Sequence, residues 1–382
     1  MLTDYGAGST LWPVSQGAGV TVAVIDSGVM KDHHDLEGQV LAGADFTGEG
    51  SDGTVDKDGH GTGMASLIAG HGHGDDAGIM GLAPKVKILP IRVSWSTDGS
   101  VAQIGLANGI RFAVDHGATV VNMSIGGYSG SDQETRTAVK YAVDHDVVLV
   151  ASTGNSGQET ASVEYPAAFP GVVAVGAVNR QGRLWEKSTY GPETTLAGPG
   201  AEIYRASAKS SAGYGVANGT SDAAAYVSAT AALIRSKYPA LSAGQVINRM
   251  IKSAAPPADG TVVPNNHYGY GILAPAKALE ANPAVDNGSR ENPLVKRPES
   301  RGAPPADDPT DGASDVAVAP GADGGGSRGN GMGLVVGAAA GGVALVVGVV
   351  VALVVRARRR RRVAAAGAFQ QLPFQQPPYG GS

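Results

Sequence analysis

Five short, continuously apolar runs constrain the fold of this chain more than any other feature. They are rich in Val and Ile and occupy residues 20–26, 86–93, 118–124, 147–153 and 172–178. Runs of this length that do not alternate with polar residues fit strands buried on both faces of a parallel sheet. Helix-like stretches are interspersed with them or follow them, at residues 101–116, 132–145 and 226–238. We therefore predict an α/β fold, a three-layer sandwich with a mainly parallel sheet.

The order of segments predicts one large domain followed by a membrane anchor. Residues 1–19 are expected to form an irregular lead-in, and residues 20–282 carry the alternation of strands and helices. Residues 283–331 are rich in Pro, Gly and polar residues, which is typical of a linker. Residues 332–355 are apolar, lack charge and are long enough to cross a bilayer as a helix. Six arginines open the basic, then Gln/Pro-rich tail 356–382, so we expect this tail in the cytoplasm and the large domain outside.

Charge and cysteine content exclude several classes of protein. The net charge of −5 argues against a nucleic-acid-binding protein, which is usually basic. The absence of Cys excludes disulfides and thiolate metal sites. The first residues show neither the basic start nor the long apolar run of a signal peptide. Because an external domain has to be exported, we expect the true translation start to lie upstream.

Four polar residues stand where α/β folds place reactive groups. Asp26 ends an apolar run, His60 lies between two glycines before a helix, and Ser221 begins a helix. The N-terminus of a helix would stabilise an oxyanion beside Ser221, and Asn155, in a loop after a strand, has an amide that can donate to the same oxygen. Taken alone, each residue favours an ordinary role in a turn, a surface loop or a helix start.

Together these residues and their surroundings resemble the subtilisin-like serine proteases over about residues 10–280. The Asp–His–Ser order is that of the family. The resemblance implies that Ser221 is the nucleophile, that His60 is the general base and later acid, and that Asp26 orients the imidazole. It implies an oxyanion-hole donor at Asn155. The matching segments are VAVIDSGV, HGTGMASLIAG, VVNMSIGG, ASTGNSG, YPAAFPGVVAVGAV and NGTSDAAAYVSATAAL, and the third implies a substrate-binding strand at Ser124, Ile125, Gly126 and Gly127.

The linker, membrane helix and basic tail resemble those of the mycosins, membrane proteases that accompany type VII secretion in actinobacteria. This resemblance implies an endopeptidase on the outer face of the cytoplasmic membrane that cleaves secreted or membrane proteins. Its expected partners are its protein substrates, membrane lipid through one helix, and type VII secretion components. A scaffold of a secretion complex with weak or dispensable proteolysis is the alternative. An α/β-hydrolase esterase is disfavoured because no G-x-S-x-G elbow surrounds Ser221.

No cofactor or metal site is predicted. His71 and His73 are interpreted as part of a solvated loop, since a clear third ligand is missing. The resemblance permits a structural calcium ion, although no ligand loop stands out. Asp222 follows Ser221 where the family often has Met or an aromatic residue, and we expect its carboxylate to raise the pKa of His60.

Overall fold

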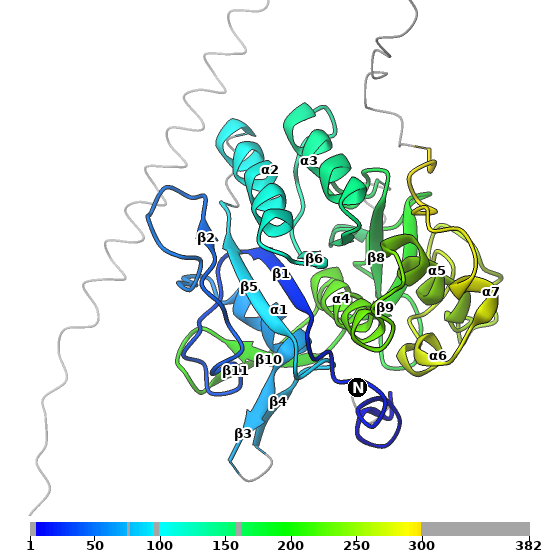
Figure 1. Cartoon of the computed structure of the whole chain (residues 1–382), viewed down its shortest axis with the longest axis horizontal. Coiled ribbons are helices and arrows are strands. Elements are labelled where there is room, and N and C mark those ends of the chain that lie inside the picture. Colours follow the sequence, from blue (N-terminus) through cyan, green and yellow to red (C-terminus); the bar gives the residue numbers. More distant parts are fainter. Residues whose placement is uncertain (1–4, 75–76, 95–98, 158–161, 299–382) are drawn as a thin grey trace, which may run out of the picture. The chain divides into compact units, whose positions relative to one another are not determined.

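The computed structural model describes residues 5–74, 77–94, 99–157 and 162–298. All of them belong to one compact unit, Met1–Asp307. Its centre is a seven-stranded sheet with the order β2-β5-β1-β6-β7-β8-β9, and every neighbouring pair of strands is parallel (Figure 1). The predicted α/β fold with a mainly parallel sheet is confirmed.

Five of the seven strands coincide with the apolar runs of the sequence. The bounds of the seven are β1 (Thr21–Asp26), β2 (Ala44–Asp45), β5 (Lys87–Arg92), β6 (Val120–Met123), β7 (Val148–Ser152), β8 (Val172–Val178) and β9 (Thr194–Pro199). Their side chains are buried almost throughout, as the absence of alternation predicted.

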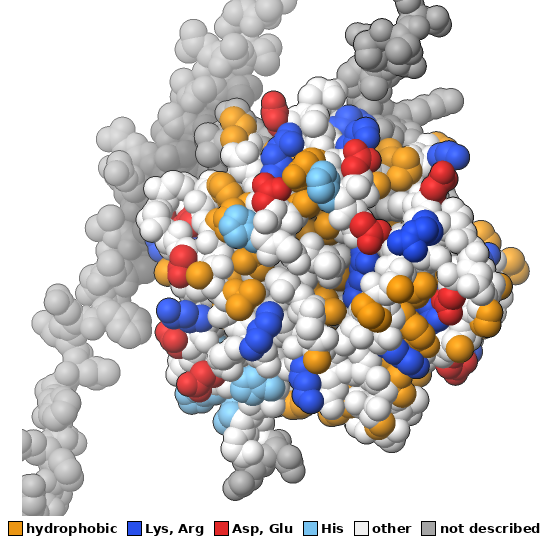
Figure 2. Space-filling view, in the orientation of Figure 1, with side chains coloured by type: hydrophobic (Ala, Val, Ile, Leu, Met, Phe, Trp, Pro, Cys, Tyr) orange, Lys and Arg blue, Asp and Glu red, His pale blue; other side chains and the backbone are white. Residues whose placement is uncertain are grey.

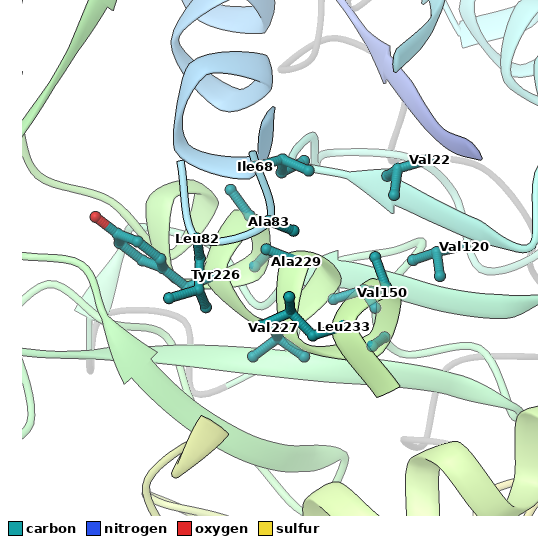
Figure 3. Packing of buried hydrophobic residues seen from close by; sticks show 14 of the residues in the cluster. Val22, Ile68, Leu82, Ala83, Val120, Val150, Tyr226, Val227, Ala229 and Leu233 are labelled. Atoms are coloured by element: carbon teal, nitrogen blue, oxygen red, sulfur yellow. The ribbon is translucent and has the colours of Figure 1, made fainter. Parts of the chain in front are cut away.

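Helices cover both faces of the sheet and so make three layers (Figure 1). The alternation of side chains along a strand divides the core. On β1, Val22 and Val24 face one helical layer, whereas Ala23 and Ile25 face the other. Figure 3 shows the first side, where Val22 and Val120 of the sheet belong to the same cluster as Leu233 of α4. The first layer contains α1 (His60–Ala69), α4 (Thr220–Lys237) and α5 (Ala243–Ser253), and the second contains α2 (Gly99–Asp115) and α3 (Gln133–Asp144).

Two short hairpins extend from this body. One pairs β10 (Ile203–Ser207) with β11 (Gly213–Ala217), and the other pairs β3 (His71–His73) with β4 (Ala77–Met80). His71 and His73 therefore lie on a strand and not in the loop that we expected, because pairing with β4 and a hydrogen bond from His73 to the buried Asp35 hold them. Acidic and basic side chains are interspersed over the face of the molecule in Figure 2.

The packed part of the chain differs from the expected boundaries at both ends. The lead-in contains a π-helix, η1 (Ala7–Leu11), whose Leu11 is completely buried. After α6 (Pro275–Leu279) and α7 (Pro283–Asp286), the chain stays on the domain at least to residue 298. The expected domain end at 282 is therefore too early.

Arg297 explains why this extension is held in place. Its guanidinium donates to the carbonyl oxygens of Ala167, Phe169, Val172 and Glu193 at 2.7–3.1 Å. Leu294 beside it is 4% exposed. The segment after residue 282 was expected to be a linker because it is rich in polar residues, and that composition gives no indication of the contacts made by Arg297 and Leu294.

The rest of the predicted linker, 299–331, the predicted membrane span 332–355 and the tail 356–382 lie outside the described residues. Among the helices that the structure does describe, none is both long enough and apolar enough to cross a membrane.

Candidate active site

Asp26 and His60 are in direct contact although 34 residues separate them. Asp26 ends β1 and is completely buried, and His60 is the first residue of α1. His60 Nδ1 lies 2.9 Å from Asp26 Oδ1 and 3.0 Å from Oδ2. Gly61 is required for this approach, because a Cβ there would collide with the carbonyl oxygen of Gly28. The carboxylate can therefore fix the orientation of the ring and leave Nε2 for proton transfer.

A second buried carboxylate, Asp56, organises the loop that delivers His60. Asp56 Oδ1 accepts from Ser27 Oγ at 2.9 Å and from the Gly59 N–H at 2.7 Å. Its Oδ2 accepts the N–H of Thr62 at 2.9 Å, which satisfies a free donor in the first turn of α1. Ser27 Oγ also accepts the N–H of Gly61 at 3.0 Å. This network links β1 to the start of α1 and so holds both members of the pair.

Ser221 lies in the first turn of α4 and faces the carboxyl end of β6. Its Oγ donates to the carbonyl oxygen of Ser124 at 3.2 Å. Asn155 lies in the loop after β7, and its Oδ1 accepts from Thr220 N at 2.9 Å and Oγ1 at 3.0 Å. Because these bonds occupy the oxygen, the amide NH₂ is the part of Asn155 available for donation. The helix terminus adds positive potential at the same place.

One pocket of about 410 Å³ brings most of the predicted residues together. We call it the active-site pocket. It contains the hydroxyl, the imidazole and the amide predicted for catalysis, together with the whole predicted substrate strand: His60, Ser124, Ile125, Gly126, Gly127, Asn155 and Ser221. Its position at the carboxyl ends of parallel strands is the usual location of ligand sites in open α/β sheets.

Two charged residues of the pocket, Glu164 and Arg205, were not predicted. Glu164 precedes a Tyr-Pro pair and Arg205 lies on the hairpin strand β10, so neither stands in a recognisable motif. Arg205 Nε lies 3.5 Å from Asp222 Oδ1, and the Asp222 side chain is almost completely buried. The sequence did not indicate a role for Arg205, because its partner Asp222 lies 17 residues further along the chain.

Charges around His60 set its protonation. Burial lowers the pKa of His60, but the Asp26 carboxylate and, less strongly, Asp222 raise it, and the result is a raised pKa despite the opposing effect of Arg205. Burial raises the pKa of Asp222, while Arg205 and His60 lower it in part. The expected influence of Asp222 on His60 therefore has the predicted sign.

Within the part of the chain that the structure describes, no group of three or more His, Asp and Glu residues is arranged to hold a metal ion. Hydroxyl, imidazole and amide groups account for the chemistry that the pocket can perform.

Comparisons with known proteins identify the family of this chain. The profile of the Subtilase family of peptidases matches residues 17–271. Subtilisin DY of Bacillus licheniformis is 38% identical over 264 residues, which cover 68% of this chain and 90% of that protein. For several other Bacillus subtilisins the match spans 65% of their length.

Similar proteins with solved structures are also proteases. MycP1 from Mycobacterium smegmatis superposes with a TM-score of 0.66 and 28% identity, over 76% of this chain and 86% of that one. The MycP3 protease from the type VII (ESX-3) secretion system gives 0.64 and 32%, over 73% and 86%. The chain thus belongs to the Subtilase family and is a subtilisin-like serine endopeptidase.

Proposed function

We propose that this endopeptidase is held on the outer face of the cytoplasmic membrane, where it cleaves secreted or membrane-associated proteins. The observation that carries the catalytic part is the 2.9 Å contact between His60 and the buried Asp26, beside Ser221 in one pocket. The anchor is residues 332–355, which contain no charge and are followed by six arginines.

In this mechanism Ser221 attacks the carbonyl carbon of the scissile peptide bond while His60 Nε2 takes its proton. The resulting oxyanion is stabilised by the Asn155 amide and the N-terminus of α4. Asp26 stabilises the imidazolium, which then gives its proton to the leaving amine, and an acyl-enzyme remains on Ser221. Water, activated by the same imidazole, releases the acid product and restores the serine.

The likeness to MycP1 and MycP3 supports a role beside a type VII secretion system. MycP3 is described as a protease from such a system, and both resemble this chain over most of its described part. We propose that type VII secretion components are its partners and that its substrates reach it as they are exported.

A fluorophosphonate probe tests the catalytic part of the proposal. Such probes react with an activated serine, so the full chain should be labelled and Ser221→Ala should not. Lack of labelling of the wild-type chain would refute an active enzyme. If a secretion complex purified with the chain persists with Ser221→Ala, a scaffolding role exists beside catalysis.

The absence of cysteine allows a direct test of orientation. Thr261→Cys places one thiol on the exposed surface of the peptidase domain, and Ser382→Cys places one at the end of the tail. In intact cells a membrane-impermeant maleimide should label the first and not the second. The reverse pattern would refute the orientation, and recovery of the protein without membranes would refute the anchor.

A further inference from the structure

Glu164 places a carboxylate in the wall of the active-site pocket. The carboxylate lies against two glycines, because a Cβ at Gly126 or at Gly154 would collide with its oxygens. It accepts the backbone N–H of Gly127. The backbone of Glu164 is itself fixed, since its N–H donates to the carbonyl oxygen of Thr153 at 3.0 Å. The charge is therefore held at one place in the pocket.

This carboxylate is the uncompensated charge of the pocket. The other charged side chains there are paired, Asp222 with Arg205 at 3.5 Å and His60 with Asp26 at 2.9 Å. Among the described residues, no cation lies within ion-pairing distance of Glu164. Burial raises the pKa of Glu164, because its charged form is poorly hydrated inside the pocket. A cation brought by a ligand would satisfy it.

The carboxylate adjoins the two segments that surround the reacting atoms. Ser124, which accepts from Ser221, is two residues before Gly126, and Asn155 directly follows Gly154. A substrate residue whose carbonyl carbon meets Ser221 and whose oxygen meets Asn155 would place its own side chain beside these segments. We therefore expect that side chain to approach the Glu164 carboxylate, which lies against Gly126 and Gly154.

We propose that Glu164 makes the enzyme prefer lysine or arginine at the residue that supplies the attacked carbonyl. This inference rests on the proposed endopeptidase mechanism and adds the substrate class. A lysine or arginine stem fills the glycine-walled space and brings its cation to the carboxylate. A large apolar side chain would cover the charge without providing a partner, which is unfavourable.

The test compares peptide p-nitroanilides that differ only in the residue before the scissile bond: lysine, arginine, norleucine and phenylalanine. Norleucine has the lysine stem without the charge. For the wild-type chain, kcat/KM for lysine should exceed that for norleucine by about tenfold or more. Glu164→Gln keeps the shape and an acceptor for the Gly127 N–H but loses the charge, so the ratio should fall to about one. Glu280→Gln, at an exposed carboxylate outside the pocket, should keep the wild-type ratio.

The outcomes separate this inference from the proposed function. Hydrolysis with a wild-type preference for norleucine or phenylalanine, or a lysine ratio unchanged by Glu164→Gln, would overturn the inference and leave the peptidase intact. An equal loss for all four substrates in a variant that still reacts with the fluorophosphonate would show a purely structural role for Glu164 and also overturn it. Failure of the wild-type chain to cleave any peptide or react with the probe would overturn both.

Discussion

Replacing Asp26 with asparagine tests the proposed mechanism most directly. In the structure, both carboxylate oxygens lie within 3.0 Å of His60 Nδ1, and Oδ1 also accepts the N–H of Ser27 at 2.8 Å. Asparagine preserves the shape and one acceptor, so the local fold should survive. It removes the negative charge that stabilises the imidazolium and presents an NH₂ group that favours the wrong tautomer of His60.

The magnitude follows from the distance between the two groups. For unit charges 2.9 Å apart, Coulomb's law with an effective dielectric constant of about 20 gives about 6 kcal/mol. Since about 1.4 kcal/mol corresponds to a tenfold change in rate, kcat should fall by about 10⁴-fold. An asparagine in place of the triad aspartate of another serine protease has an effect of this size.

The assay is the saturating rate of hydrolysis of a peptide p-nitroanilide, followed from acid to alkaline pH. Because Asp26 raises the pKa of His60, the residual activity of Asp26→Asn should also begin at lower pH than that of the wild type. The control is Asp58→Asn, which neutralises an exposed carboxylate two residues before His60 and should leave kcat unchanged. A folded Asp26→Asn variant with kcat within about tenfold of the wild type would refute the assigned role.

Three further results are expected. Asn155→Ala should lower kcat by about 10²–10³-fold with little change in KM, the magnitude known for the oxyanion-hole asparagine of a subtilisin, and an unchanged kcat would contradict its role. Asp222→Asn removes a carboxylate that raises the pKa of His60; since neutral His60 is the active form, the acid limb of the pH profile of kcat/KM should move to lower pH, and a limb that stays or rises would contradict this. Arg297→Met should lower the free energy of unfolding by about 2–4 kcal/mol in urea titrations, because buried carbonyl oxygens lose their donor, and an unchanged midpoint would show that they find water instead.

The sequence predicted the layers of the fold well, because a strand buried on both faces of a sheet has a continuous run of apolar residues. The ends of the domain were harder. The segment after residue 282 is rich in polar residues, yet Arg297 holds it through backbone carbonyl groups, and a backbone contact leaves no pattern of side chains in the sequence. The strand that carries His71 and His73 was missed as well, because Gly and His give no strand pattern and β4 supplies the pairing.

In the site, too, the residues within recognisable local segments were predicted, and those that act through distant contacts were not. Asp26, His60 and Ser221 were predicted from short segments that each have a recognisable context, and the structure brings them to the carboxyl ends of neighbouring strands. Asp56 and Glu164 were missed because their importance lies in contacts with residues distant in sequence or in the backbone around them. A single sequence contains no direct record of such contacts.

The hydrogen bonds from Arg297 to four carbonyl oxygens have a mechanical consequence. Tension applied to the chain beyond residue 298 would first meet these bonds, which attach Arg297 to the loop before β8, to the first residue of β8 and to the residue before β9. Only then would it reach α7 or α5. These bonds are loaded together rather than one after another, so the force is shared. A pull on this end of the domain would therefore meet the bonds of Arg297 before it reached α4, the helix that carries Ser221.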